Sequence, residues 1–418
     1  MITVLTKISW RAKRKQGRLR CHSGRHRFDT SVSLVISQTR FLQSASKSIL
    51  VFSFLLFAFC APAPVRAQTH FARVEKTWQW QFPRDHGQHT KFQTEWWYFT
   101  GNLKAENGHR FGYELTFFRQ AFLPRLSARP SSWAFRDVYI AHFAITEVEK
   151  ENFYYDQKIS RGALNLAGAD SAALAVHLGD WFARQETATP SAGIGKIQLR
   201  ALSTFGKIDF VLTPMQPPVF HGVKGLLPNS DLPGDGAYYY SLPNLQTEGI
   251  LKLNDDAFYL RGTSWMDHEF FTPVVDIKSV HWDWLSLHLS DSTEVMLAQL
   301  HRGSGAEVLH STGTFIQRNG TAQTLSSREI GLEPQAWWTS PVSGGKYPLA
   351  WKIKFLDYEL QLSTPVKNQE LDTRRTTGNF YWEGYVEASG KKGGQTVRGE
   401  GYLEMTGYEN PPKAKSAQ

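Results

Sequence analysis

Cysteine is nearly absent from this chain, with two residues in 418. Both of them, Cys21 and Cys60, precede residue 68. The 351 residues from 68 to 418 therefore contain no thiol, which excludes disulfides, thiolate metal sites and cysteine nucleophiles there. A segment of this length can bury its own hydrophobic cores, so it needs no covalent cross-links to fold.

A net excess of positive charge is also missing once the first 67 residues are set aside. The formal charge of +9 rests on 47 Lys and Arg residues, of which twelve lie in residues 1–67 beside a single acid, Asp29. Residues 68–418 hold 35 basic and 37 acidic side chains, a net charge of −2. Proteins that bind nucleic acid need a basic surface to neutralise phosphates. We therefore expect no nucleic-acid partner.

Long hydrophobic runs are limited to residues 49–61, an uncharged apolar run of thirteen, which is short of the ~20 residues of a membrane-spanning helix. Basic residues precede the run, and Val65 and Ala67 supply a cleavage site before Gln68, so residues 1–67 have the pattern of a leader with a cleaved signal peptide. We expect an exported protein, periplasmic or secreted. The alternative is that the run stays attached as a membrane anchor. Because the leader is long, we also hypothesise a translation start at a codon other than that of Met1.

Familiar catalytic motifs are absent as well. The sequence contains no G-x-S-x-G elbow, no H-E-x-x-H, no P-loop and no G-x-G-x-x-G. Imidazole and carboxylate groups are available for a divalent ion, but no two of the histidines show the spacing of metal ligands; the candidates are His142, His221, His268, His281 and Glu269. We therefore predict neither a metal site nor a cofactor.

What the sequence does contain is alternation with a period of two. Residues 111–117 and 138–143 alternate in the way that is typical of β-strands, and similar runs continue to residue 386. Turn residues separate the runs, above all Asn319-Gly320, a hairpin signal between two apolar stretches. The one helix candidate is residues 170–176, whose end could equally be a strand. We predict an all-β chain with antiparallel sheets.

A faint internal repeat indicates two similar halves. Aligning Trp96 with Trp282 places Tyr98 on Trp284. Every second side chain of an extended strand lies on the same face, so Trp96 shares a face with Tyr98, and Trp282 shares one with Trp284. Each half has the length of an antiparallel barrel that holds one small ligand. The predicted domains are residues 68–270 and residues 271–412, followed by a disordered tail at 413–418.

The densest cluster of ionisable residues is Asp267-His268-Glu269. In an extended strand Asp267 and Glu269 share one face and His268 takes the other. Two carboxyls on one face push their pKa values apart, which leaves one protonated near neutral pH as an acid and the other ionised as a base. The alternative is a structural role at a barrel rim or an inter-domain seam, with Lys or Arg as partners.

Aromatic residues are abundant, at 13% of the chain with 14 Trp. The most conspicuous are Trp96, Trp97, Tyr98, Tyr238, Tyr239, Tyr240, Trp282, Trp284, Tyr381 and Trp382. Buried Trp and Tyr need partners for their N–H and O–H groups, so they suit a cavity with apolar walls and a few polar fixing points. Packing within an ordinary core is the alternative for at least half of this set.

Several of these segments together resemble the carotenoid 1,2-hydratase (hydroxyneurosporene synthase) family and its secreted AttH-like relatives. The matching segments run in order through the chain: residues 95–103, 238–241, 262–269, 282–284, 381–384 and 399–408. The resemblance implies two tandem lipocalin-like β-barrels. It also implies acid-catalysed addition of water to an isolated isoprenoid double bond.

The same resemblance suggests a role for individual residues. Asp267 would be the proton donor, and Glu269 or His268 would steer the water. The apolar ligand, an isoprenoid or another lipid, would lie against aromatic faces that stabilise a carbocation. The predicted binding residues are Trp97, Tyr98, Tyr240, Trp282 and Trp284.

Three functions are compatible with these observations, because fold transfers between relatives more safely than function. The first is a lipocalin-like protein that binds an isoprenoid or lipid and hydrates it. The second is a non-catalytic lipid carrier or envelope-assembly factor, associated with a membrane surface or an ABC exporter. The third is a secreted hydrolase that uses a carboxylate-activated water.

Overall fold

A computed structural model describes residues 70–125, 131–186, 195–230, 232–274, 280–302 and 307–409. The predicted leader and the predicted C-terminal tail lie outside these residues. Within them, no helix is both long enough and apolar enough to cross a membrane.

The first sheet contains 13 antiparallel strands, and the short 3₁₀ helix η3 (Arg84–His86) precedes it. Its strands are β1 (Thr94–Ala105), β2 (Arg110–Ala121), β3 (Asp137–Glu147), β4 (Asn152–Arg161), β5 (Ala167–Ala169), β6 (Ala175–Leu178), β7 (Trp181–Gln185), β8 (Ile197–Leu202), β9 (Gly206–Pro214), β10 (Val219–Phe220), β11 (Leu226–Pro228), β12 (Gly236–Leu253) and β13 (Asp256–Phe271). Their spatial order is β4-β3-β2-β1-β13-β12-β9-β8-β7-β6-β5, with β10 and β11 beside β12. The first and last strands of the sheet, β1 and β13, are therefore hydrogen-bonded neighbours.

The second sheet contains ten antiparallel strands and repeats this arrangement. Its elements are β14 (Val280–Leu289), β15 (Glu294–Arg302), β16 (Glu307–Ile316), β17 (Ala322–Leu325), η4 (Ser327–Glu329), β18 (Ile330–Thr339), β19 (Lys346–Phe355), β20 (Tyr358–Ser363), β21 (Glu370–Asp372), β22 (Phe380–Lys392) and β23 (Gln395–Thr406). The order is β17-β16-β15-β14-β23-β22-β20-β19-β18, with β21 beside β22, so the first strand again pairs with the last.

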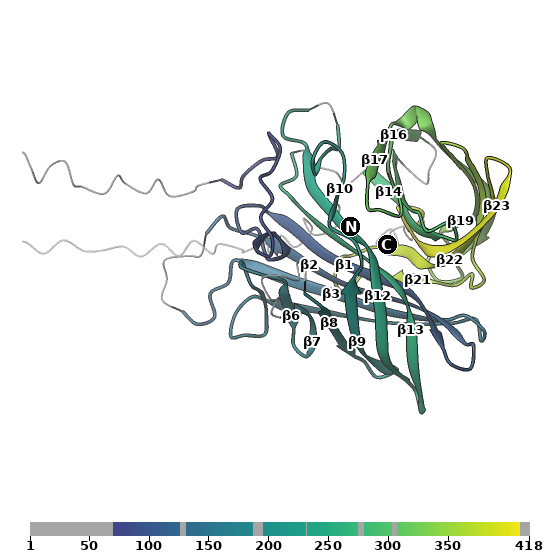
Figure 1. Ribbon diagram of the computed structural model, residues 1–418. Helices are drawn as coiled ribbons and strands as arrows, with labels where there is room; N and C mark the ends of the chain where they lie inside the picture. Colours follow the sequence, from purple (N-terminus) through teal and green to yellow (C-terminus); the bar gives the residue numbers. More distant parts are fainter. Residues whose placement is uncertain are drawn as a thin grey trace, which may run out of the picture. The chain divides into compact units, whose positions relative to one another are not determined.

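The second sheet curls into a nearly closed barrel, whereas the first forms a half-barrel (Figure 1). This confirms the prediction of an all-β chain with two lipocalin-like units. The predicted hairpin at Asn319-Gly320 joins β16 to β17, and Gly320 has a φ of +80°, a left-handed conformation that favours glycine. The helix candidate is wrong: residues 171–174 form a bend and β6 follows, because the apolar residues there alternate instead of repeating every third or fourth position.

Each sheet fills its own interior with side chains. In the first sheet, Trp97, Phe99 and other odd-numbered residues of β1 belong to a large core. In the second sheet, Leu285 and Leu287 of β14 belong to a second core. Because alternate side chains of a strand point to opposite faces, Tyr98 and Trp284 face away from these cores, and they meet in a third cluster that joins the two sheets.

Candidate functional site

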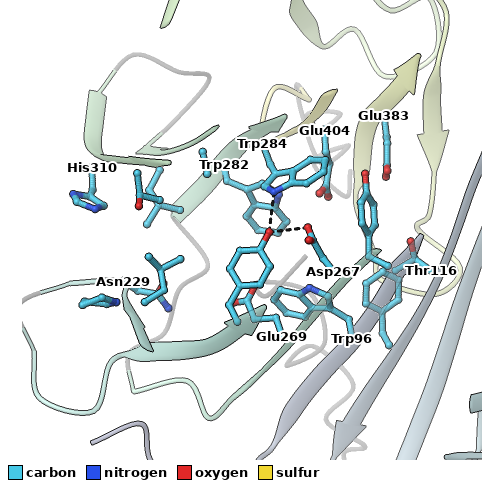
Figure 2. Close-up of a pocket in the computed structure, with 18 of the residues that line it drawn as sticks. Trp96, Thr116, Asn229, Asp267, Glu269, Trp282, Trp284, His310, Glu383 and Glu404 are labelled. Atoms are coloured by element: carbon cyan, nitrogen blue, oxygen red, sulfur yellow. Dashed lines mark hydrogen bonds between the residues drawn. The ribbon is translucent and has the colours of Figure 1, made fainter. Parts of the chain in front are cut away.

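A pocket lies where the outer faces of the two sheets meet, with about 910 Å³ of empty space, part of it open to solvent (Figure 2). Its walls are built from both sheets; the lining residues are Trp96, Tyr98, Glu114, Thr116, Phe118, Leu227, Pro228, Asn229, Tyr239, Asp267, Glu269, Trp282, Trp284, Ala298, Leu300, His310, Thr312, Glu383 and Glu404. The sequence predicted a ligand held inside a barrel. The space lies between the sheets instead, because apolar side chains occupy both interiors.

The pocket has an open end and a closed end. Pro228 and His310 at one end are exposed to solvent, whereas Glu114, Thr116 and Glu383 at the other end are buried. In Figure 2, Asp267 lies between His310 on one side and Glu383 on the other. A bound ligand would therefore pass the Asp267 carboxyl on its way from the mouth to the closed end.

Strand register brings the polar residues of the first sheet together. Tyr98 of β1 pairs with Asp267 of β13, and Trp96 pairs with Glu269. On the other side of β13, Tyr239 of β12 pairs with Glu269. These cross-strand partners share one face of the sheet, which is the face that lines the pocket.

Asp267 is buried, with 4% of its surface exposed, and three side chains donate hydrogen bonds to its carboxyl group. The Trp265 Nε1–H and the Ser241 hydroxyl donate to Oδ1, the former at 2.6 Å, and the Tyr239 hydroxyl donates to Oδ2 at 2.7 Å. Burial raises the pKa of Asp267 to about 7, although these hydrogen bonds favour the charged form. Asp267 is therefore close to half-protonated at neutral pH.

A second layer of hydrogen bonds orients the groups around Asp267. The Trp284 Nε1–H donates to the Tyr239 hydroxyl at 3.1 Å, which fixes the phenolic proton toward Asp267. His221 lies 2.6 Å from Ser241 through Nε2 and 2.8 Å from Thr314 through Nδ1. Burial lowers the pKa of His221 to about 3, so its ring is neutral. Since Ser241 donates to Asp267, we assign the ring proton to Nε2, with Thr314 donating to Nδ1.

Glu269 lies beside Asp267 and is half-buried. Among the described residues no hydrogen-bond donor reaches its carboxyl group. Burial raises the pKa of Glu269 well above its usual value, and the charges of Asp267 and Glu404 raise it further. The sequence predicted one protonated and one ionised carboxyl. Instead both pKa values are raised by burial, and within the part of the chain that the structure describes no Lys or Arg lines the pocket to favour either charged form.

Three more carboxyl groups line the pocket: Glu114 on β2, Glu383 on β22 and Glu404 on β23. Burial raises the pKa of Glu114 to about 8, even though Thr116 and Tyr381 donate hydrogen bonds to its Oε1 at 2.9 and 3.3 Å. Burial and the charges of its neighbours raise the pKa of Glu383 well above normal, and burial raises that of Glu404. The pocket thus holds five carboxyl groups whose pKa values are all raised above their usual range.

The predicted site residues divide between the pocket, which both sheets line, and the interior of the first sheet. Asp267, Glu269, Tyr98, Trp282 and Trp284 line the pocket. The remaining three are buried on the opposite face of the half-barrel and do not reach it; they are Trp97, Tyr240 and His268. The reason is the period of two, since each of the three neighbours a lining residue in the sequence.

Sequence reasoning missed several lining residues. It selected Tyr240, whereas its neighbour Tyr239 lines the pocket, an error of one position that a period of two turns into the wrong face. It also missed Glu114, Glu383 and Glu404. A usable signal was present, because each of these acids interrupts an apolar strand, and such an acid requires a partner or a function.

His268 takes part in a buried ionic network on the opposite face. Glu95 accepts hydrogen bonds from His89 Nδ1 at 2.8 Å, His268 Nε2 at 2.9 Å and Arg119 Nε at 2.9 Å. Within the described residues, His89, Glu95 and His268 are the one group that could hold a metal ion. The Arg119 guanidinium already neutralises Glu95, so a cation would meet a positive charge there. The geometry fits a structural ion pair better than a metal site.

Comparison with known proteins agrees with this architecture. The AttH-like family matches residues 73–408. The chain belongs to the AttH-like family. A crystal structure attributed to AttH of Nitrosomonas europaea is 31% identical, covers 81% of this chain and 100% of its own, and superposes with a TM-score of 0.72.

A more distant structure shares the fold of this AttH-like chain. Kievitone hydratase of Nectria haematococca is 15% identical, covers 82% of this chain and 98% of its own, and has a TM-score of 0.59. At this identity the likeness shows the fold alone. A search of curated proteins finds no match to the sequence.

Proposed function

We propose that this AttH-like protein adds water to an isolated carbon–carbon double bond of an uncharged, mainly apolar ligand, an isoprenoid or a similar lipid. Asp267 is the proton donor. The observation that carries the proposal is a buried carboxyl whose pKa is about 7, in a pocket with aromatic walls. An effective general acid has a pKa near the working pH, because it is then both protonated and acidic enough to transfer its proton.

In the proposed step, the π electrons of the alkene form a C–H bond with the proton of Asp267. This leaves a tertiary carbocation and the Asp267 carboxylate. The lone pair of a water molecule then forms the C–O bond, and the extra proton of that water returns to Asp267. Glu269, whose pKa is raised by burial, orients the water through a carboxyl oxygen. The sum is one alkene and one water converted to one tertiary alcohol.

The walls of the pocket suit the positive charge of this intermediate. Trp96, Trp282 and Trp284 line the pocket around Asp267 (Figure 2). An aromatic face attracts a cation through its quadrupole, by about 2 kcal/mol or more when water is excluded. The five carboxyl groups of the lining add negative potential whenever one of them ionises.

The occurrence of a hydratase on the same fold supports the reaction class by analogy. Kievitone hydratase shares the two-domain architecture with this chain. A carrier would bind the same apolar ligand without needing Asp267. A hydrolase would need an ionised carboxylate to activate water, which the raised pKa values of Asp267 and Glu269 disfavour. Export, membrane association and an isoprenoid ligand remain predictions from the sequence.

The proposal is tested with Asp267→Asn, which keeps the shape of the side chain but removes its transferable proton. Both proteins are purified from their own host's envelope, and bound lipids are identified by native mass spectrometry and extraction. The variant should hold an unsaturated ligand. The wild-type protein should convert that ligand to a product heavier by one water, at least ~10²-fold faster than the variant does.

The matched control is Glu294→Gln. Glu294 is also buried with a raised pKa, but it accepts hydrogen bonds from Asn244 and Gln216 outside the pocket. This variant should hydrate the ligand at the wild-type rate. If wild-type protein and Asp267→Asn both return the ligand unchanged, the hydratase proposal is wrong and the carrier function is favoured.

A further inference from the structure

The closed end of the pocket contains buried polar atoms without a partner. Among the described residues, Glu114 Oε2, Glu383 Oε1 and the Tyr98 hydroxyl make no hydrogen bond within the geometric limits of one. The exposed fractions of these side chains are 1%, 2% and 7%. Buried polar groups in native proteins are almost always hydrogen-bonded, so such a group calls for a missing partner.

A proton shared between Glu114 and Glu383 accounts for the two unpartnered carboxyl oxygens. The two carboxyls interact closely enough for each to affect the pKa of the other, and at least one is protonated at neutral pH. A shared proton occupies one oxygen of each side chain. The Tyr98 hydroxyl has no partner within hydrogen-bond geometry, although it lies close enough to Glu383 for each group to affect the pKa of the other.

The charges at this end define what can bind. Glu114, Glu383 and Glu404 come together from both sheets, and no Lys or Arg among the described residues lines the pocket. Burial raises the pKa of all three, to about 8 for Glu114, so Glu114 is mainly uncharged at pH 7. An anionic group there would face carboxyls with no counter-charge. A neutral group that both donates and accepts hydrogen bonds would satisfy Tyr98 and a carboxyl at once.

We propose that the closed end is a recognition subsite for an alcohol or phenol hydroxyl of the ligand. The hydroxyl accepts a hydrogen bond from Tyr98 and donates one to Glu383 or Glu404. The apolar part of the ligand then extends past Asp267 toward the mouth at His310. This inference rests on the proposed function for the position of the double bond, and it adds the substrate class: a hydroxylated apolar molecule, not a fatty acid or a phosphate ester.

The test compares four probes in the Asp267→Asn background, in which the ligand is not turned over. They are farnesol, farnesyl methyl ether, farnesoic acid and farnesylamine, and tryptophan fluorescence reports binding through the lining Trp residues. Farnesol should bind about tenfold more tightly than its methyl ether, the worth of one good hydrogen bond. Farnesoic acid at pH 8 should bind at least as weakly as the ether.

Tyr98→Phe then locates the effect. Farnesol should bind about tenfold more weakly to this variant, because the ligand oxygen loses its donor. The matched control is Tyr113→Phe, whose hydroxyl bonds Ser264 at 2.8 Å in the core of the first sheet. It should leave the affinity for farnesol unchanged.

The outcomes separate this inference from the proposed reaction. Absence of farnesol binding, equal affinity for farnesol and the ether, or an affinity for farnesol that Tyr98→Phe leaves unchanged overturns the subsite. A preference for farnesylamine over farnesol at pH 7 also overturns it, since that result would indicate an ionised cation site. None of these affinities depends on turnover, so the reaction can fail while the subsite stands.

Discussion

The two faces of the first sheet shift the pKa of a buried carboxyl group in opposite directions. Glu95 on β1 is fully buried, and Arg119, His268 and His89 surround it with positive or hydrogen-bonding groups that hold its pKa well below normal. Asp267 on the neighbouring strand is almost as buried, yet it forms no ion pair with any described Lys or Arg, and burial raises its pKa to about 7. One carboxyl is a permanent anion in a structural ion pair, and the other is a titratable acid beside a cavity. The presence of a counter-charge therefore distinguishes the structural carboxyl, Glu95, from the titratable carboxyl, Asp267.

The largest loss of stability should come from removing Arg119, the counter-charge of Glu95. Arg119→Met leaves Glu95 and Asp137 without their buried partner, and it also removes donors to the carbonyls of His89 and Phe92. We expect the free energy of unfolding to fall by about 3–5 kcal/mol, the usual cost of breaking a buried pair. Urea unfolding followed by far-UV circular dichroism measures it.

A double variant distinguishes the charge from the packing. Arg119→Met combined with Glu95→Gln removes both charges, so it should be more stable than Arg119→Met alone. By contrast, Asp267→Asn should change the stability by no more than about 1 kcal/mol, because it removes an uncompensated acid. An Arg119→Met protein as stable as the wild type would show that the comparison between the two faces is mistaken.

An intermediate effect should appear in the pH dependence of stability. The folded pKa values of Asp267 and Glu114 are raised to about 7 and about 8, from 3.8 and 4.5. The folded state therefore holds more protons than the unfolded state between these limits, and stability falls as the pH rises through them. Buried His142 and His221, with pKa values lowered to about 3, act in the opposite sense, but only below pH 6.5.

The window from pH 6.5 to 8 thus excludes His142 and His221, whereas the carboxyls of the pocket contribute there together with other groups of raised pKa, such as His89 and Glu294. There we expect the free energy of unfolding to fall by about 1 kcal/mol per pH unit, and Glu114→Gln should make that slope shallower. Urea midpoints at four pH values across the window give the slopes. A Glu114→Gln slope as steep as that of the wild type would assign the titration to groups outside the pocket.

The alternation of side chains made part of this comparison predictable. A period of two separates Asp267 and Glu269 from His268, and the register of β13 against β1 agrees. The same rule also separates Trp97 from Tyr98, but it cannot tell which face meets a second sheet. That depends on contacts between residues far apart in the sequence, such as Tyr98 with Trp284. The choice of Tyr240 over Tyr239 failed for this reason.

For a related reason, only some of the partners of the buried acids could be predicted from a single sequence. Arg119 and Glu95 lie on adjacent strands and meet by register, which alternation could have indicated. Glu114 and Glu383 come from different sheets, and nothing local connects them. Whether an acid in an apolar strand is paired or free is decided by such distant partners. The sequence therefore indicated where acids are unusual, and the structure distinguishes the ion pair from the titratable cluster.

The smallest effect should come from adjusting Asp267 without removing it. Ser241 donates a hydrogen bond that favours the charged form of Asp267, so Ser241→Ala should raise the pKa of that carboxyl further. We expect the alkaline limb of the hydration pH profile to move up by up to about one pH unit, which corresponds to one ordinary hydrogen bond. Thr314→Val is the matched comparison. Thr314 lies at the far end of the hydrogen-bond chain that reaches Asp267 through His221 and Ser241, so this variant should shift the limb less. A limb that moves to lower pH in Ser241→Ala would mean that the titrating acid of the pocket is not Asp267.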